Sequence, residues 1–179
     1  LADIAMLHPM DTVMLEYAMT ENKTHKILNL EKRVKKILTA LLYSNIDCDF
    51  ISEANLPFQK IEIDNGIRIG EMKYSAVIIP PITTIRRTTL DVLNEFSASG
   101  GRIVFTGDCP KYLDGELSDA PKSIYDKALH IESTDEIIKY FEDIRRVKIE
   151  VEGEENKFIH RLSEKDGDYW LFIARCERL

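Results

Sequence analysis

Residues 74–109 decide the fold, and they read YSAVIIPPITTIRRTTLDVLNEFSASGGRIVFTGDC. A buried strand, a loop marked by two prolines, an amphipathic helix over 88–98, a Gly-Gly turn and a second buried strand over 102–106 follow one another. This order predicts a β-α-β crossover between parallel strands. Ligands and catalytic groups collect at the carboxyl ends of such strands, so the segment also marks where a site is expected.

Apolar runs on both sides extend this unit into one α/β domain over residues 1–146. They predict further parallel strands at 2–7, 47–51, 74–79 and 127–131. Three- and four-residue spacing predicts an amphipathic helix from Ile27 to Leu42 that stops near Ser44-Asn45. The fold class predicted is α/β: a doubly wound, mostly parallel sheet with helices on both faces.

Shorter elements are predicted around these strands. A short helix is expected around 13–19, an irregular hairpin around Asn65-Gly66 within 60–71, and a polar loop over 109–122. A last helix is expected over 134–144, with Thr134 as its N-cap and acidic residues in its first turn.

The pattern changes after Arg146. Three strands are predicted at 147–152, 157–163 and 168–174, joined by turns at Gly153 and Asp166-Gly167. Three strands bury little surface alone. We therefore expect residues 147–179 either to pack on the α/β domain or to open a truncated β-sandwich domain.

Charge and composition exclude several classes of protein. The formal net charge is −7, whereas nucleic-acid binding needs clustered Lys and Arg, so no nucleic-acid partner is expected. The apolar runs are too short to cross a membrane, and no leader precedes the first strand. Because the chain begins at Leu1, we interpret it as an excerpt of a longer protein. Three separated cysteines form no disulfide or zinc pattern, which favours a reducing, cytoplasmic location.

Cys109 is the first candidate for chemistry, because it follows a parallel strand. An activated thiolate needs a helix N-terminus or a cation, and a base nearby. Here Pro110 follows, and the next segment is too polar and broken to predict a helix. A loop cysteine without chemistry is the favoured interpretation.

Other candidates are histidines and carboxylates near the carboxyl edge of the sheet. His8 follows the first strand, and His130 with Glu132 lies at the expected fifth strand. Four carboxylates are expected near the same edge: Glu53, Asp108, Asp114 and Glu116. Of the residues at this edge, His8, Glu53 and Asp108 are the candidates for contact with a ligand. No metal-ligand spacing and no glycine-rich phosphate loop is found, so neither a metal nor a cofactor is expected.

The order of several short motifs resembles a known family. They are the strand ending at His8-Pro9, DFISE at 49–53, YSAVIIPP at 74–81, Thr89-Leu90 with Phe96, and GGRIVFTG at 100–107. In this order they resemble the glutamine-amidotransferase-like domain inside large bacterial glycoside hydrolases. The relatives nearest in style are α-L-rhamnosidase-type enzymes and the β-galactosidase trimerisation domain. FIHR at 158–161 and DYWLFI at 168–173 are similar to the hairpin that opens the next β-sandwich in rhamnosidase-type chains.

The resemblance implies an empty catalytic position. In class I glutamine amidotransferases the strand leads into Gly-x-Cys-x-Gly, and alignment from Gly100-Gly101 places the nucleophile position at Gly107. Cys109 lies two residues beyond it, although His130-x-Glu132 has the spelling of the family's His-x-Glu. We therefore expect amidotransferase chemistry to be absent.

The function expected is that of a non-catalytic accessory domain of a multidomain glycoside hydrolase, whose catalytic carboxylates lie on a separate barrel. Its partners would be the other domains, with further copies of the chain or carbohydrate as additional possibilities. Two alternatives stay open: a cysteine-dependent hydrolase or amidotransferase using Cys109, and a small-molecule or sugar-binding module.

Overall fold

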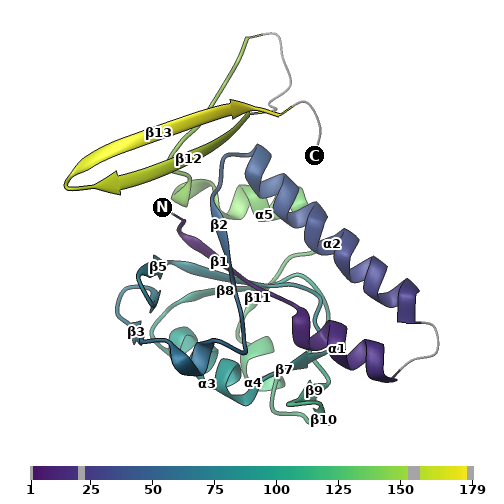
Figure 1. The fold of residues 1–179 in the computed structure, drawn as a ribbon. Helices are drawn as coiled ribbons and strands as arrows, with labels where there is room; N and C mark the ends of the chain where they lie inside the picture. Colours follow the sequence, from purple (N-terminus) through teal and green to yellow (C-terminus); the bar gives the residue numbers. More distant parts are fainter. Residues whose placement is uncertain (1, 20–22, 153–157, 177–179) are drawn as a thin grey trace.

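The computed structural model describes residues 2–19, 23–152 and 158–176 (Figure 1). A parallel sheet runs through the centre, helices lie on both of its faces, and a two-stranded ribbon projects from one end (Figure 1). The predicted α/β class is confirmed at this level. Within the described ranges, no helix is both long and apolar enough to cross a membrane.

The central sheet contains five parallel strands. In order across the sheet they are β2 (Cys48–Ile51), β1 (Ile4–Leu7), β6 (Ala76–Ile79), β8 (Arg102–Phe105) and β11 (Leu129–His130). Numbered along the chain, this order is 2-1-3-4-5, so the direction in which strands are added reverses beside β1. All five strands fall within predicted ranges.

The side chains of these strands alternate between two hydrophobic clusters, one on each face. Ile4 and Met6 pack with one set of helices, whereas Ala5 and Leu7 pack with the other. Because both faces of the sheet are covered, every residue of the central strands β1 and β6 is buried, and these two strands read as continuous apolar runs.

In the part of the chain that the structure describes, five α-helices cover or flank the sheet: α1 (Met10–Met19), α2 (Lys23–Tyr43), α3 (Arg87–Ala98), α4 (Lys122–Tyr125) and α5 (Thr134–Tyr140). α2 and α5 pack together on one face, and α3 and α4 lie together on the other (Figure 1). The predicted apolar stripe of α2 is confirmed, because Leu30, Ile37 and Leu41 are buried.

The Gly-Gly turn after α3 has a steric cause at each glycine. Gly100 has a φ of +86°, a left-handed conformation that residues with a side chain rarely adopt. A Cβ at Gly101 would lie only 2.3 Å from the ring of Phe96, which is fully buried beneath α3. The pair therefore lets the chain leave α3 and enter β8 directly.

The predicted hairpin at 60–71 is confirmed and has one further strand. β3 (Ile61–Ile63), β4 (Ile67–Ile69) and β5 (Met72–Tyr74) form an antiparallel sheet. Tyr74 therefore belongs to β5 and not to the third parallel strand, which begins at Ala76. The amide of Ser75 donates to the carbonyl of Asp3 (2.8 Å), and this bond marks the change of sheet.

The region predicted as a polar loop contains short strands. β7 (Thr84–Ile85), β9 (Tyr112–Leu113) and β10 (Glu116–Leu117) form a second small sheet, with Asp114-Gly115 at the turn. The prediction was wrong because two-residue strands carry no periodic signal, although Asp-Gly is itself a hairpin signal.

The helix predicted over 134–144 is shorter than expected. α5 ends at Tyr140, and a 3-10 turn, η2 (Glu142–Ile144), follows it. The N-cap is Ser133 rather than Thr134, and the acidic first turn of Asp135 and Glu136 is present as predicted.

The described residues of the C-terminal segment, 147–152 and 158–176, contain two long strands where three short ones were predicted. β12 (Phe158–Lys165) and β13 (Asp168–Arg175) pair antiparallel over their full length. Residues 147–152 form no strand, because the amide of Ile149 donates to the side chain of Asn45 (3.1 Å) instead of to a neighbouring strand. The predicted turn at Gly153 lies outside the described residues.

Candidate functional site

Loops that leave the carboxyl ends of the strands assemble the candidate site. The β1 loop and the start of α1 carry Asp11, the segment after β2 carries Glu53, and the loops after β6 and β8 carry Arg86 and Cys109. Glu53 and Asp108 therefore both follow strands of the sheet, but Glu53 is buried whereas Asp108 lines a cleft.

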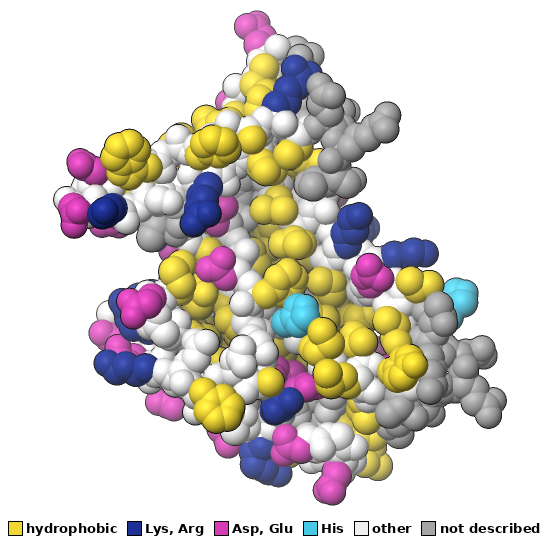
Figure 2. Space-filling view, viewed as in Figure 1, with side chains coloured by type: hydrophobic (Ala, Val, Ile, Leu, Met, Phe, Trp, Pro, Cys, Tyr) yellow, Lys and Arg dark blue, Asp and Glu magenta, His cyan; other side chains and the backbone are white. Residues whose placement is uncertain are grey.

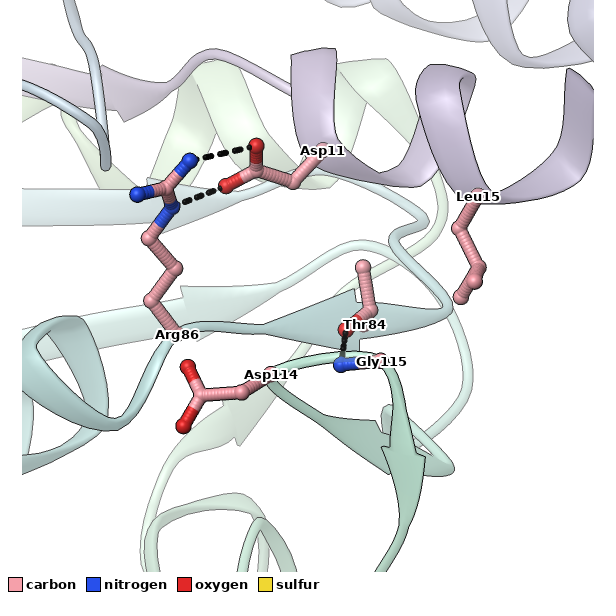
Figure 3. A pocket seen from close by; sticks show the side chains of 6 residues that line it. All are labelled: Asp11, Leu15, Thr84, Arg86, Asp114 and Gly115. Atoms are coloured by element: carbon pink, nitrogen blue, oxygen red, sulfur yellow. Dashed lines mark hydrogen bonds and ion pairs between the residues drawn. The ribbon is translucent and has the colours of Figure 1, made fainter. Parts of the chain in front are cut away.

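The first cleft, the Arg86 cleft, has a volume of about 380 Å³. It is lined by Asp11, Leu15, Thr84, Arg86, Asp114 and Gly115 (Figure 3). The guanidinium of Arg86 forms two parallel bonds with the carboxylate of Asp11, Nε to Oδ2 at 2.5 Å and Nη2 to Oδ1 at 2.9 Å (Figure 3). Such a bidentate pair fixes the orientation of both side chains.

Glu53 is buried directly behind this pair, with only 3% of its surface exposed. Its Oε2 accepts a bond from the backbone amide of Arg86 (2.8 Å). Burial raises the pKa of the Glu53 carboxyl to about 7, because the protein interior solvates its charge poorly; the bond from Arg86 and the nearby Thr89 hydroxyl oppose that shift. Glu53 thus titrates close to neutral pH.

Glu53 and Asp114 accept hydrogen bonds from the backbone amides at the start of α3. No side chain within the helix caps it, and the acceptors come from distant segments. Glu53 accepts from the amide of Arg86, and Asp114 Oδ1 accepts from the amide of Arg87 at 3.0 Å. Negative groups at a helix N-terminus are favourable, so these carboxylates have a structural role here.

The second cleft, the Cys109 cleft, has a volume of about 550 Å³ and contains Asp108 and Cys109 in its wall. The thiol is half-buried, and its Sγ lies 3.6 Å from the carbonyl oxygen of Pro110. Burial, followed by the charge of Asp126, raises the pKa of the Cys109 thiol. An activated nucleophile requires the opposite shift.

Gly107, two residues before Cys109, has no room for a side chain. A Cβ at Gly107 would lie 2.7 Å from Cβ and 2.8 Å from Cα of Pro81. A cysteine at the expected nucleophile position would therefore displace the backbone of the loop after β6.

The predicted histidines do not converge on one reactive atom. His130 Nε2 donates to the carbonyl of Tyr125 (2.7 Å), and its ring stacks on that tyrosine at 4.0 Å. Glu132 is exposed nearby. Burial is the main cause that raises the pKa of Tyr125, and the negative charges of Asp108, Cys109 and Glu132 raise it further. His8 lies at another strand, with its ring edge against Phe50 at 5.2 Å.

Sequence reasoning missed Arg86 and Asp11, which form a bidentate ion pair at the edge. They are 75 residues apart, so no local spacing signals their contact. Among the described residues, no group of three His, Cys, Asp or Glu side chains is arranged to hold a metal ion.

Comparison with known proteins gives similarity in structure but not in sequence. No family model and no curated protein matches the chain. The GH42 exo-carrageenase from Bacteroides ovatus, in its apo form, matches with a TM-score of 0.60 and 11% identity over 96% of this chain and 22% of that chain. At this identity the match shows a shared fold.

Two β-galactosidases match less well. The enzyme from Bacillus circulans sp. alkalophilus gives a TM-score of 0.47 at 22% identity, over 65% of this chain and 15% of that chain. A catalytic mutant of Gan42B, a GH42 β-galactosidase from G. stearothermophilus, gives 0.48 at 18% identity, over 66% and 15%. The chain spans about a fifth or less of the length of these neighbours.

Proposed function

We propose that this chain is a non-catalytic accessory domain of a multidomain glycoside hydrolase. One observation carries the proposal: 96% of the chain shares its fold with only 22% of a much longer GH42 enzyme. A fold that occupies so small a part of a hydrolase is suited to supporting the catalytic domain, contacting other copies or bordering the sugar cleft.

The closed position at Gly107 supports the non-catalytic part of the proposal. The strand order 2-1-3-4-5 with helices on both faces is that expected of a doubly wound, glutamine-amidotransferase-like domain. In such a domain the nucleophile would occupy Gly107, where Pro81 leaves no room. Cys109, two residues later, has a raised thiol pKa, which disfavours the alternative of a cysteine-dependent enzyme.

We infer two units within the chain, residues 1–146 and residues 147–179, the second opening a β-sandwich. The exposed apolar side chains of β13 support this division, because a ribbon with both faces in water gains stability only when another element covers it.

The test compares the 179-residue chain with the complete product of its gene. Both are assayed on nitrophenyl β-D-galactoside and α-L-rhamnoside. We expect hydrolysis by the complete product and none by the chain alone. Hydrolysis by the chain that Cys109→Ser abolishes, or a complete product without glycosidase activity, would overturn the proposal.

A labelling experiment on the chain tests the cysteine alternative separately. With iodoacetamide at pH 7.5, we expect Cys109 to react more slowly than glutathione, because burial holds it as a thiol. Faster reaction than glutathione would favour a cysteine-dependent site instead.

A further inference from the structure

The reversal of strand order creates a crevice between the connections that leave β1 and β6. The Arg86 cleft borders this crevice, and another cleft lies on the side of α2. From β1 the chain passes to α2 on one face, whereas from β6 it passes to α3 on the other. Connections that leave adjacent parallel strands toward opposite faces open a crevice at the carboxyl edge. Ligands of open α/β sheets bind at that place.

A third cleft lies at this crevice, and we call it the Arg33 cleft. Its volume is about 260 Å³, and it is bounded by α1, α2 and the loop after β6. The polar residues that line it are Thr12, Glu16, Lys26, Asn29, Arg33 and Thr83. The volume is slightly below the range of roughly 300–1,000 Å³ of drug-sized ligand sites, so it suits a small metabolite.

Among the described residues that line the Arg33 cleft, the charges of Glu16, Lys26 and Arg33 sum to one positive charge. Lys26 Nζ pairs with Glu16 Oε2 at 3.0 Å, which leaves Arg33 to set the sign. Arg33 Nη2 donates to the carbonyl of Thr106 (2.7 Å) at the end of β8, and this bond holds the guanidinium beside the edge of the sheet. The bond uses one of its five N–H donors, so the group keeps donors for an anion.

Thr83 supplies a second, independent observation. Its Oγ1 is buried and has no hydrogen-bond partner among the described residues. The backbone amide of Thr83 donates to Oγ1 of the buried Thr12 (3.0 Å), which holds the residue in place. A buried hydroxyl without a partner costs free energy. Because Thr83 lines the cleft, rotation of its side chain toward a bound ligand would remove that cost.

We propose that the Arg33 cleft binds a small hydroxylated anion. A carboxylate or phosphoryl group of the ligand is bound by Arg33, and a ligand hydroxyl bonds to Thr83 when rotation of that side chain brings its Oγ1 to the surface of the cleft. The inference rests on the crevice, the single uncompensated positive charge and the unpaired hydroxyl, and it does not depend on the proposed function.

The test is calorimetric titration of the 179-residue chain with three matched probes: D-galacturonate, D-galactose 6-phosphate and neutral D-galactose. We expect the two acids to bind at least tenfold more tightly than galactose, and the tighter of the two distinguishes a carboxylate from a phosphoryl ligand. Equal binding of all three, or no binding of either acid at millimolar concentration, overturns the proposal.

Variants assign the binding to this cleft. Arg33→Gln is expected to weaken acid binding more than tenfold, and Thr83→Val, which removes a hydroxyl that has no described partner, several-fold. Lys36→Gln is the matched control, because Lys36 is an exposed cation of α2 outside the cleft. Circular dichroism checks the fold of each variant. Should Arg33→Gln not fold, Thr83→Val still decides: unchanged affinity in that variant, or equal loss in Lys36→Gln, contradicts the site.

Discussion

The pKa of Glu53 shows how strongly burial changes the ionisation of a carboxyl group. Its sequence context predicts a carboxylate at the sheet edge, and its burial behind the Arg86–Asp11 pair raises its pKa to about 7. The folded protein therefore retains a proton on Glu53 at a pH where the unfolded chain has released it. Stability must depend on pH as a result.

Because the folded pKa is raised, stability from Glu53 is complete below pH 4.5 and falls as the pH rises toward 7. The loss is about 3 kcal/mol over that window, since each pH unit between the two pKa values contributes about 1.4 kcal/mol. Glu53→Gln keeps an acceptor for the amide of Arg86 and cannot ionise. Urea unfolding from pH 4 to pH 8 should show the wild type losing this free energy relative to Glu53→Gln.

Glu62→Gln provides a control of opposite sign, because the pairing of Glu62 with Lys60 lowers its pKa. That contribution is lost as the pH falls, and it is small because the side chain is exposed. A flat difference between wild type and Glu53→Gln across the whole range would contradict the assigned shift.

At the scale of elements, α3 depends on contacts that close its two ends. Its first turn is capped by carboxylates from the segment after β2 and from the β9–β10 turn, and its last turn meets Gly100-Gly101. The helix is therefore held by partners distant in sequence rather than by its own caps. Packing of Leu90, Leu93 and Phe96 on the sheet also stabilises the helix.

Gly101→Ala tests the steric role of the second glycine. The new Cβ would meet the buried Phe96 ring, so we expect a loss of about 1–3 kcal/mol in the free energy of unfolding, as for an overpacked core. Gly100→Ala is the matched control, because nothing lies within 4 Å of its Cβ and only the left-handed φ is unfavourable, at about 1 kcal/mol. Equal losses in the two variants would argue against the contact with Phe96.

Elements with many buried residues could be predicted from the sequence, and those fixed by single contacts could not. The runs at 76–79 and 103–105 are apolar throughout because both faces of the sheet are covered. Residues 147–152 have the composition of a strand, yet Asn45 takes the amide of Ile149. In the candidate site, Glu53 and Asp108 were predicted at the edge, whereas the pairing of Arg86 with Asp11 depends on tertiary structure alone.

At the scale of the whole molecule, the ribbon of β12 and β13 is the surface that most needs a partner. Its exposed apolar side chains are consecutive in β13: Tyr169, Trp170, Leu171, Phe172 and Ile173. Consecutive strand residues point to opposite faces, so both faces of the ribbon carry apolar surface. Figure 2 shows hydrophobic side chains along this ribbon and continuing over the body below it.

Trp170→Ser tests whether the ribbon is uncovered in the isolated chain. Trp170 is the single tryptophan and is 67% exposed, so its replacement should change the free energy of unfolding by no more than about 0.5 kcal/mol. It should also reduce concentration-dependent association in sedimentation velocity. Ile78→Ala, in the fully buried β6, is the control and should cost about 2–5 kcal/mol. A loss of similar size in Trp170→Ser would mean that the tryptophan is covered.

Asn45 lies where this ribbon contacts the body. Asn45 follows α2 and has a φ of +55°. Its Nδ2 donates to the carbonyl of Phe158 (3.0 Å), and its Oδ1 accepts from the amide of Ile149. Nearby, His160 pairs with Asp47 at 3.3 Å. Each strand of the ribbon has eight residues and extends about 26 Å at about 3.3 Å per residue. A rotation of the ribbon by about 1° about its contact with Asn45 would therefore move its far tip by about 0.5 Å.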